Sequence, residues 1–173
     1  MKNIRLRSYK DTGAILVADG LISPERLAEA TDVQQRAGLS IGRALVELGF
    51  ISEWELARAV AKELGVAFIR LRNIEYKNAA NAKLDPAVMN HYRFFILDTF
   101  DGVDTVVVTE PPPVELLTEI STVLGEKVFF VVSLMSDVER ALLLTAPLAT
   151  ASTAAFAAEG GATAEEILRG FGA

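Results

Sequence analysis

The sequence predicts an α+β protein in which an amino-terminal four-helix module, made of two tandem 24-residue motifs, precedes a small β-β-α-β-α subdomain. Three observations lead to this prediction. A duplicated segment with helix-capping signals comes first, short apolar runs of strand character follow it, and 51% of the 173 residues are hydrophobic. Such a chain can bury a core in one compact domain or two small ones. We expect the parts to span 1–72, 73–145 and 146–173, the last being an Ala/Thr/Gly-rich flexible tail or linker.

An internal repeat with an offset of 29 residues is the strongest signal in the chain. Residues 11–34 align with residues 40–63 without a gap, and eight of the 24 positions are identical. In the first copy the identities are Gly13, Leu16, Val17, Gly20, Ile22, Ser23, Leu27 and Ala30. Because all of these are apolar, glycine or helix-cap positions, we interpret the repeat as a duplicated supersecondary unit.

Each copy predicts a short helix, a glycine stop and a longer helix. The short helices cover 12–19 and 41–48, and the glycine after each can take the left-handed conformation that ends a helix. A Ser-Pro pair at 23–24 and a Ser-Glu-Trp-Glu capping box at 52–55 start the longer helices, which end at Gly38 and Gly65. The shared apolar positions are predicted to form the core between the copies.

Beyond residue 65 the pattern changes to one of short strands and helices. An apolar run at 66–69 leads into a polar connection at 73–81. The predicted elements are then a helix at 85–92, strands at 93–98 and 104–109 with a turn at Asp101-Gly102, a helix from the prolines at 111–113 to about 124, a strand at 127–133, and a helix from a capping box at 136–139 to about 144.

Composition excludes most catalytic and metal-based functions. The chain has no cysteine and one histidine, which excludes thiolate metal sites and thiol chemistry and leaves little for histidine-based catalysis. No P-loop and no Gly-x-Gly-x-x-Gly motif after a strand is present. Asp98, Asp101 and Asp104 alternate like calcium ligands, but no glutamate stands at the twelfth position of an EF-hand loop, which favours a solvated hairpin turn. We expect neither an enzyme nor a bound cofactor or metal, and no catalytic role for His91.

Charge divides the chain into two unlike halves. Residues 1–75 hold 11 Lys and Arg against 10 Asp and Glu, whereas residues 76–173 hold 6 against 13. The net charge of −6 argues against a nucleic acid polymer as partner, while a near-neutral first half can accept a small anion. The start has no signal-peptide core, and the uncharged run at 141–158 contains threonines and Pro147. These features predict a cytoplasmic location without membrane insertion.

Function is expected in the duplicated module. Its two short helices each have a small residue and a glycine in the first turn, so their free backbone N–H groups can face a common surface and hold an anion. A two-fold ligand with two phosphates and two flat bases would match the duplication, with leucine and isoleucine side chains supporting the bases. The alternative interpretation is that small residues only let the helices approach closely. Trp54 is either an exposed contact residue or a cover for the core.

The two blocks resemble the tandem motif of the MshEN-type cyclic-di-GMP-binding domain, the amino-terminal domain of type II secretion and type IV pilus assembly ATPases. That motif runs from Arg-Leu-Gly to a closing Gln and appears here at 11–34 and 40–63, with 35–39 as spacer. The resemblance reaches to about residue 144. It implies a non-enzymatic regulatory domain that binds cyclic-di-GMP and docks a protein partner of a secretion, pilus or related envelope system. The ligand-binding residues it implies are Thr12, Gly13, Leu16, Gly20, Leu21, Ile22, Leu27, Gln34, Ile41, Gly42, Arg43, Leu45, Gly49, Phe50, Ile51, Leu56 and Glu63.

Three polar positions depart from the motif. Asp11 and Ser40 stand in place of its arginines and Glu63 in place of the second glutamine, while Gln34 is kept. A carboxylate near a phosphate is repulsive by roughly 1 kcal/mol or more, and serine cannot replace a bidentate arginine. We therefore expect dinucleotide binding to be weakened, repositioned or lost, with replacement cations among Arg5, Arg7, Arg36 and Arg43. The alternative is a degenerate adaptor of the same fold that binds only protein, docking through its acidic second half.

Overall fold

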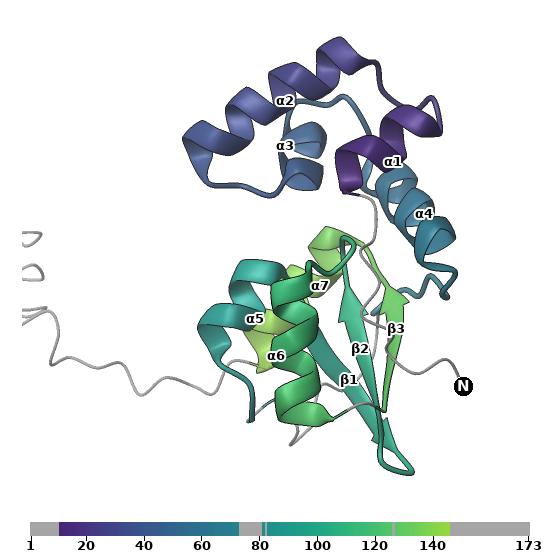
Figure 1. Ribbon diagram of the computed structural model, residues 1–173, viewed down its shortest axis with the longest axis vertical. Coiled ribbons are helices and arrows are strands. Elements are labelled where there is room, and N and C mark those ends of the chain that lie inside the picture. The colour runs from purple at the N-terminus through teal and green to yellow at the C-terminus, as the bar shows by residue number, and fades with distance from the viewer. Residues whose placement is uncertain (1–10, 73–80, 82, 126, 146–173) are drawn as a thin grey trace, which may run out of the picture.

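The computed structural model describes residues 11–72, 81, 83–125 and 127–145. Helices α1 to α4 gather at one end, and a three-stranded sheet with α5, α6 and α7 forms the other (Figure 1). The predicted α+β fold is confirmed. The elements are α1 (Thr12–Ala18), α2 (Pro24–Ala37), α3 (Ile41–Glu47), α4 (Glu53–Leu64), α5 (Pro86–Tyr92), β1 (Phe95–Phe100), β2 (Val103–Val108), α6 (Val114–Leu124), β3 (Val128–Val132) and α7 (Met135–Thr145). The basic arm at the start, most of the polar connection and the Ala/Thr/Gly-rich tail lie outside the described residues.

The two copies of the repeat fold alike because the same local signals recur. α1 and α3 end before Gly20 and Gly49, whose φ angles of 70° and 69° lie in the left-handed region. The hydroxyls of Ser23 and Ser52 cap α2 and α4, and the predicted capping box with Glu55 is present. α2 and α4 stop at glycines in the same left-handed conformation, as the sequence predicts.

The sheet has the order β1-β2-β3. β1 and β2 form the predicted antiparallel hairpin, and the turn residues Asp101 and Gly102 both have positive φ angles of 49° and 70°. β3 runs parallel to β2, with α6 as the connection between them. β1 begins two residues later than predicted, because Arg93 takes a φ of 53° as the C-cap of α5.

The predicted capping box at 136–139 is wrong. α7 begins at Met135, so Ser136 and Asp137 lie inside its first turn. The Ser136 hydroxyl donates to Glu53 Oε2 on α4 at 2.7 Å. Asp137 is 2% exposed and accepts from Arg70 Nε at 2.7 Å. The side chains that the local pattern assigned to a helix cap therefore bond to residues far away in sequence. The helix expected to open at the prolines 111–113 begins just after them, because Pro113 is the N-cap residue of α6.

Buried apolar side chains form one cluster that runs through both ends of the molecule. In the duplicated module it contains the predicted pairs Leu16 and Leu45, both 0% exposed. In the sheet it contains Val106 to Val108 and Phe94 to Ile96, all at most 1% exposed. The helical module and the sheet are therefore packed against each other through a shared core. The division into three parts stays a prediction.

The described residues contain neither a membrane-spanning helix nor a cluster of metal-ligating side chains. No helix there is long and apolar enough to cross a membrane. No group of three or more His, Cys, Asp or Glu side chains in the same residues is placed to hold a metal ion. In the hairpin, Asp104 is 8% exposed and accepts a hydrogen bond from Thr99, while Asp98 and Asp101 are exposed.

Candidate functional site

A cavity of about 590 Å³ lies between the duplicated module and the sheet. Its volume is within the range of small-molecule sites. The module contributes the start of α1, the end of α2 and the start of α3, including Asp11, Gln34 and Ser40. The other wall comes from the end of α5 and from the loop that follows β2, residues 109–113. Three positions that the motif assigns to polar ligand contacts, 11, 34 and 40, thus meet in one cavity although they span 30 residues.

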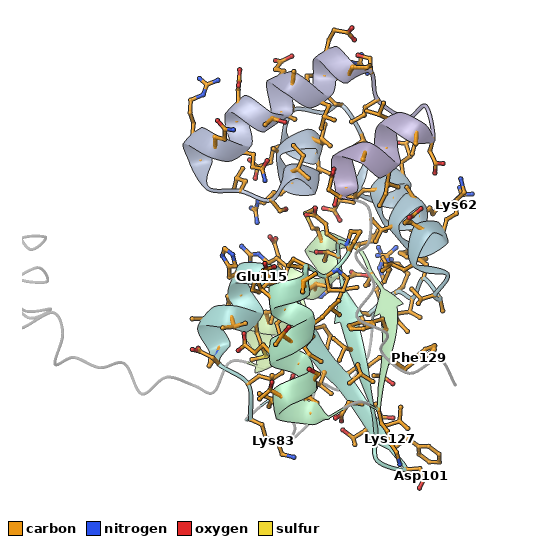
Figure 2. All side chains as sticks on the ribbon, in the orientation of Figure 1. Lys62, Lys83, Asp101, Glu115, Lys127 and Phe129 are labelled. Atoms are coloured by element: carbon orange, nitrogen blue, oxygen red, sulfur yellow. The ribbon has the colours of Figure 1, made fainter. Side chains whose placement is uncertain are left out.

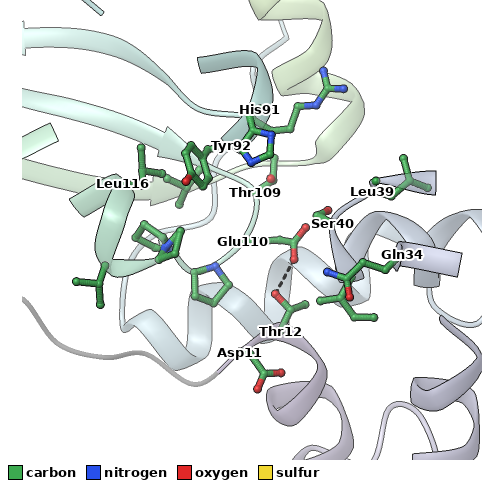
Figure 3. A pocket seen from close by; sticks show the side chains of 18 residues that line it. Asp11, Thr12, Gln34, Leu39, Ser40, His91, Tyr92, Thr109, Glu110 and Leu116 are labelled. Atoms are coloured by element: carbon green, nitrogen blue, oxygen red, sulfur yellow. Dashed lines mark hydrogen bonds between the residues drawn. The ribbon is translucent and has the colours of Figure 1, made fainter. Parts of the chain in front are cut away.

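Glu110 is the central polar group of the cavity. Its Oε2 accepts from Thr12 Oγ1 at 2.7 Å and from the backbone N of Gly42 at 3.2 Å. Figure 3 shows Thr12 and Glu110 pointing toward one another, with Ser40 and Gln34 nearby. One carboxylate thus contacts the first turns of both short helices, through the Thr12 hydroxyl of α1 and the Gly42 backbone N–H of α3. Both of these bonds go to Oε2, and Oε1 has no hydrogen-bond partner among the residues that the structure describes.

The residues that replace the two motif arginines are helix caps. Asp11 Oδ1 accepts from Ala14 N at 2.8 Å at the start of α1, and Ser40 Oγ accepts from Arg43 N at 3.3 Å at the start of α3. Each therefore satisfies one of the free donors of its helix. At the two positions where the resembled motif has arginine, this chain therefore has a local stabilising bond in place of a cationic side chain.

Two nitrogen-bearing side chains reach the cavity from the end of α5. His91 and Arg93 line it, and Arg93 Nη1 also lies 3.9 Å from Glu139 Oε1 of α7. The predicted replacement Arg43 donates to Glu47 and to Glu139 instead. The hydrogen bond to Glu47 raises the pKa of Arg43 against the effect of burial, and the charge of Glu139 adds to the increase. Arg36 lies outside the lining residues and donates to the backbone O of Asp32 at 3.1 Å. The other two predicted cations, Arg5 and Arg7, lie outside the described residues.

The apolar residues among the predicted ligand-binding positions differ in how deeply they are buried. Leu16, Leu45, Ile22, Ile51 and Leu56 are at most 6% exposed and belong to the core cluster. Leu21, Leu27, Ile41 and Phe50 are partly buried against that cluster. Ile41 lines the cavity, together with the neighbouring Leu39. Gly20, Gly49 and Glu63 are exposed and do not line it.

Sequence reasoning missed the wall that the second half supplies. Glu110, His91 and Arg93 are far from the tandem motif in sequence, and the repeat gave no reason to include them. One signal was available for Glu110, because it follows the buried strand β2 and precedes three prolines. Ligand groups often gather at the carboxyl ends of strands.

The cavity combines donors, acceptors and apolar surface. Arg93 and the imidazole of His91 can face an anion, while Glu110 Oε1 and the Gln34 amide can accept from N–H groups of a heterocycle. Leu39, Ile41 and Tyr92 supply apolar contact area. This set can bind a polar ligand that carries both a flat base and an anionic group. Binding is the chemistry that these donors, acceptors and apolar contacts support.

Two curated relatives share sequence with the chain. The type IV pilus assembly ATPase PilB of Myxococcus xanthus is 40% identical over 63 residues, 36% of this chain. PilB of Thermus thermophilus is 27% identical over 118 residues, 67% of this chain. The matched regions amount to 11% and 13% of these relatives, so the chain spans roughly a tenth of their length. No protein-family model matches the chain.

Solved structures share the fold. MshE with cyclic-di-GMP superposes with a TM-score of 0.58 at 21% identity, covering 77% of this chain and 96% of that one. The N-terminal domain of XpsE superposes with a TM-score of 0.62 at 16% identity, covering 80% and 98%. The chain therefore shares the fold of MshE and of the N-terminal domain of XpsE, which confirms the expected resemblance at the level of the fold.

Proposed function

We propose that this chain is a non-enzymatic regulatory domain of the secretion and pilus ATPase type that binds cyclic-di-GMP and passes ligand occupancy to a protein partner in the cytoplasm. The observation that carries the proposal is the cavity in which motif positions 11, 34 and 40 meet Glu110 and Arg93. The shared fold with MshE, solved with cyclic-di-GMP, supports the choice of ligand.

The ligand chemistry fits the walls of the cavity. A guanine base presents N–H donors on one edge, which a carboxylate oxygen such as Glu110 Oε1 can accept, and its face can lie on Ile41 or Tyr92. The phosphates would meet Arg93 and His91 rather than the first residues of the two motifs. Binding is therefore repositioned toward α5 and weakened by the carboxylate of Asp11. The apolar residues of the motifs act by holding α1 and α3 in place.

Isothermal titration calorimetry of the full chain with cyclic-di-GMP tests the proposal. We expect a Kd of about 100 µM or tighter and a thermal shift with ligand at about 100 µM, because ligand at a concentration equal to Kd stabilises the folded state by about 0.4 kcal/mol. Arg93→Ala should weaken binding at least tenfold. Arg36→Ala, which removes an exposed arginine outside the cavity, is the matched control and should leave the Kd unchanged. Absence of heat and of thermal shift would reject cyclic-di-GMP as ligand.

One observation favours the second candidate, an adaptor that binds protein alone. Two carboxylates, Asp11 and Glu110, line the cavity, and Glu110 already binds the first turns of both short helices. An internal carboxylate at that place would oppose a ligand phosphate. If the titration is silent for the wild type and stays silent for Glu110→Gln, the adaptor becomes the better explanation of the fold.

A further inference from the structure

A basic and aromatic surface lies on α4 and on the extended segment that follows it. Trp54, Arg58 and Lys62 are spaced by four residues and therefore share one face of α4. The segment that follows α4 pairs with β3, where Phe68 forms a β-bridge with Val132. Successive side chains of an extended segment alternate between its two sides, which places Phe68 and Arg70 on one side, and Arg72 follows at a turn two residues later. We call these six residues the Trp54 surface.

Trp54 is held in place yet remains accessible. Its ring lies 5.1 Å from the ring of Phe68, and the Arg70 guanidinium lies 5.0 Å from the Trp54 ring centroid. The indole is still 47% exposed, so one part of it is free to contact a partner. A large ring fixed by neighbours loses little conformational freedom on binding.

Arg70 is positioned by a buried carboxylate. Asp137 Oδ2 accepts from Arg70 Nε at 2.7 Å and from the backbone N of Leu71 at 3.2 Å, while its Oδ1 accepts from Arg140 at 2.8 Å. The Asp137 side chain is 3% exposed, whereas those of Arg70 and Arg140 are 27% and 52% exposed. One hidden carboxylate thus fixes two arginines that still reach solvent.

The surface is positive in a protein of net charge −6. Arg58 and Arg72 are exposed and make no ion pair or side-chain hydrogen bond with any residue that the structure describes. Lys62 pairs with Asp19 at 2.7 Å but is 71% exposed, and it lies on the outer side of α4 (Figure 2). Of the other acids on α4, Glu53 accepts from Ser136, Glu55 belongs to the capping box, and Glu63 lies half a turn around the helix from Trp54. None of the six residues lines the cavity between the two halves.

We infer that the Trp54 surface docks an acidic segment of a partner protein, with an apolar side chain of that segment on the indole and its carboxylates on the arginines. Tryptophan and arginine are the residues that most often dominate binding at protein interfaces. Charge complementarity selects an acidic partner and speeds association. A nucleic acid is disfavoured because a handful of cations beside an acidic remainder neutralises few phosphates. The inference stands whether or not the cavity binds cyclic-di-GMP.

Fluorescence gives a direct test, because Trp54 is the single tryptophan of the chain. The probe is an unlabelled peptide of alternating glutamate and leucine, and the control peptide has lysine in place of glutamate. We expect the glutamate peptide to shift the Trp54 emission to shorter wavelength with a saturable, salt-sensitive curve. The lysine peptide should leave the emission unchanged.

Variants assign the binding to the surface. Arg58→Glu and Arg72→Glu remove exposed arginines, so folding should persist while peptide affinity falls at least tenfold in the double variant. Arg36→Glu on α2 makes a matched charge change outside the Trp54 surface. Its peptide affinity should fall less than twofold. Trp54→Ala, followed with a fluorescein-labelled peptide, should also lose at least tenfold. An unchanged emission with the glutamate peptide, equal loss in Arg36→Glu, or binding of single-stranded DNA or phosphatidylserine vesicles in preference to the peptide would overturn the inference.

Discussion

The carboxyl carbon of Glu110 lies 2.8 Å from the position that a Cβ would take on Gly42. Gly42 is thus required for the close approach of a side chain from the sheet to the first turn of α3. Its repeat partner Gly13 meets a different neighbour, since a Cβ there would lie 2.5 Å from Leu27 Cδ1 of α2. The same glycine of the duplicated motif serves packing inside the module in one copy and contact with the sheet in the other.

The same substitution at these two glycines should have unequal effects. In Gly42→Ala the flexible Glu110 side chain moves away, and a gain of up to about 1 kcal/mol in helix propensity offsets the lost hydrogen bond. We expect the free energy of unfolding to stay within about 1 kcal/mol of wild type. In Gly13→Ala the packed Leu27 must shift, so a loss of about 1 to 2 kcal/mol is expected. Urea unfolding followed by circular dichroism compares them, and a larger loss in Gly42→Ala would contradict the assignment.

Thr12 and Glu110 should be energetically coupled across 98 residues of sequence. The Thr12 side chain is buried at 3% exposure and donates to Glu110 Oε2 at 2.7 Å. A double-mutant cycle with Thr12→Val and Glu110→Ala, each of which removes one partner of the bond, should give a coupling energy of about 1 kcal/mol. The control cycle pairs Thr12→Val with Glu115→Ala, which changes an exposed glutamate on α6, and should give additive changes. Additivity in the first cycle would show that the contact does not persist in solution.

Restoring the motif arginines should exchange stability for affinity. Asp11 and Ser40 are N-caps, so Asp11→Arg and Ser40→Arg should each lower the free energy of unfolding by about 1 kcal/mol. Both changes also add a cation beside the cavity, and the double variant should bind cyclic-di-GMP at least tenfold more tightly. Ser23→Arg removes the equivalent cap of α2 away from the cavity. Ser23→Arg should lower the free energy of unfolding without raising the affinity for cyclic-di-GMP in titration calorimetry. A gain in affinity equal to that of the double variant would instead indicate nonspecific charge attraction.

Asp137 should make stability depend on pH in the acid range. Burial raises the pKa of Asp137, but hydrogen bonds from Arg70 and the Leu71 amide and the charges of Arg70 and Arg140 outweigh it and leave the pKa below its usual value. The folded pKa is therefore lower than the unfolded value of about 3.9. The resulting stability is present above that value and is lost as pH falls through the folded pKa.

Asp137→Asn should lower the free energy of unfolding by about 2 kcal/mol at pH 7 and flatten its decline toward acid pH. Asp101→Asn changes an exposed acid in the hairpin turn, where asparagine also tolerates a positive φ, and should cost less than about 0.5 kcal/mol. Chemical unfolding at several pH values compares the variants. Equal acid sensitivity in Asp137→Asn and wild type would mean that other groups set the pH dependence.

Much of the duplicated module could be predicted because its signals are local. The caps at Ser23 and Ser52 and the left-handed glycines act within a few residues of themselves, so the elements they bound follow from the chain alone. The capping box at 136–139 failed for the opposite reason. Ser136 and Asp137 have stronger partners on α4 and in segment 66–72, and no local pattern reveals them.

The repeat, the order of helices and strands, and the unusual residues at the motif positions for arginine can all be predicted from the chain alone. Only the folded structure shows that Asp11 and Ser40 share a cavity with Arg93 and Glu110, and that Arg70 is held beside Trp54. Helix and turn signals depend on bonds between near neighbours, which periodicity and capping residues report. The cavity and the Trp54 surface depend on side chains that meet only after the shared core has packed the two halves together. Contacts between residues so far apart in sequence cannot be inferred from local patterns.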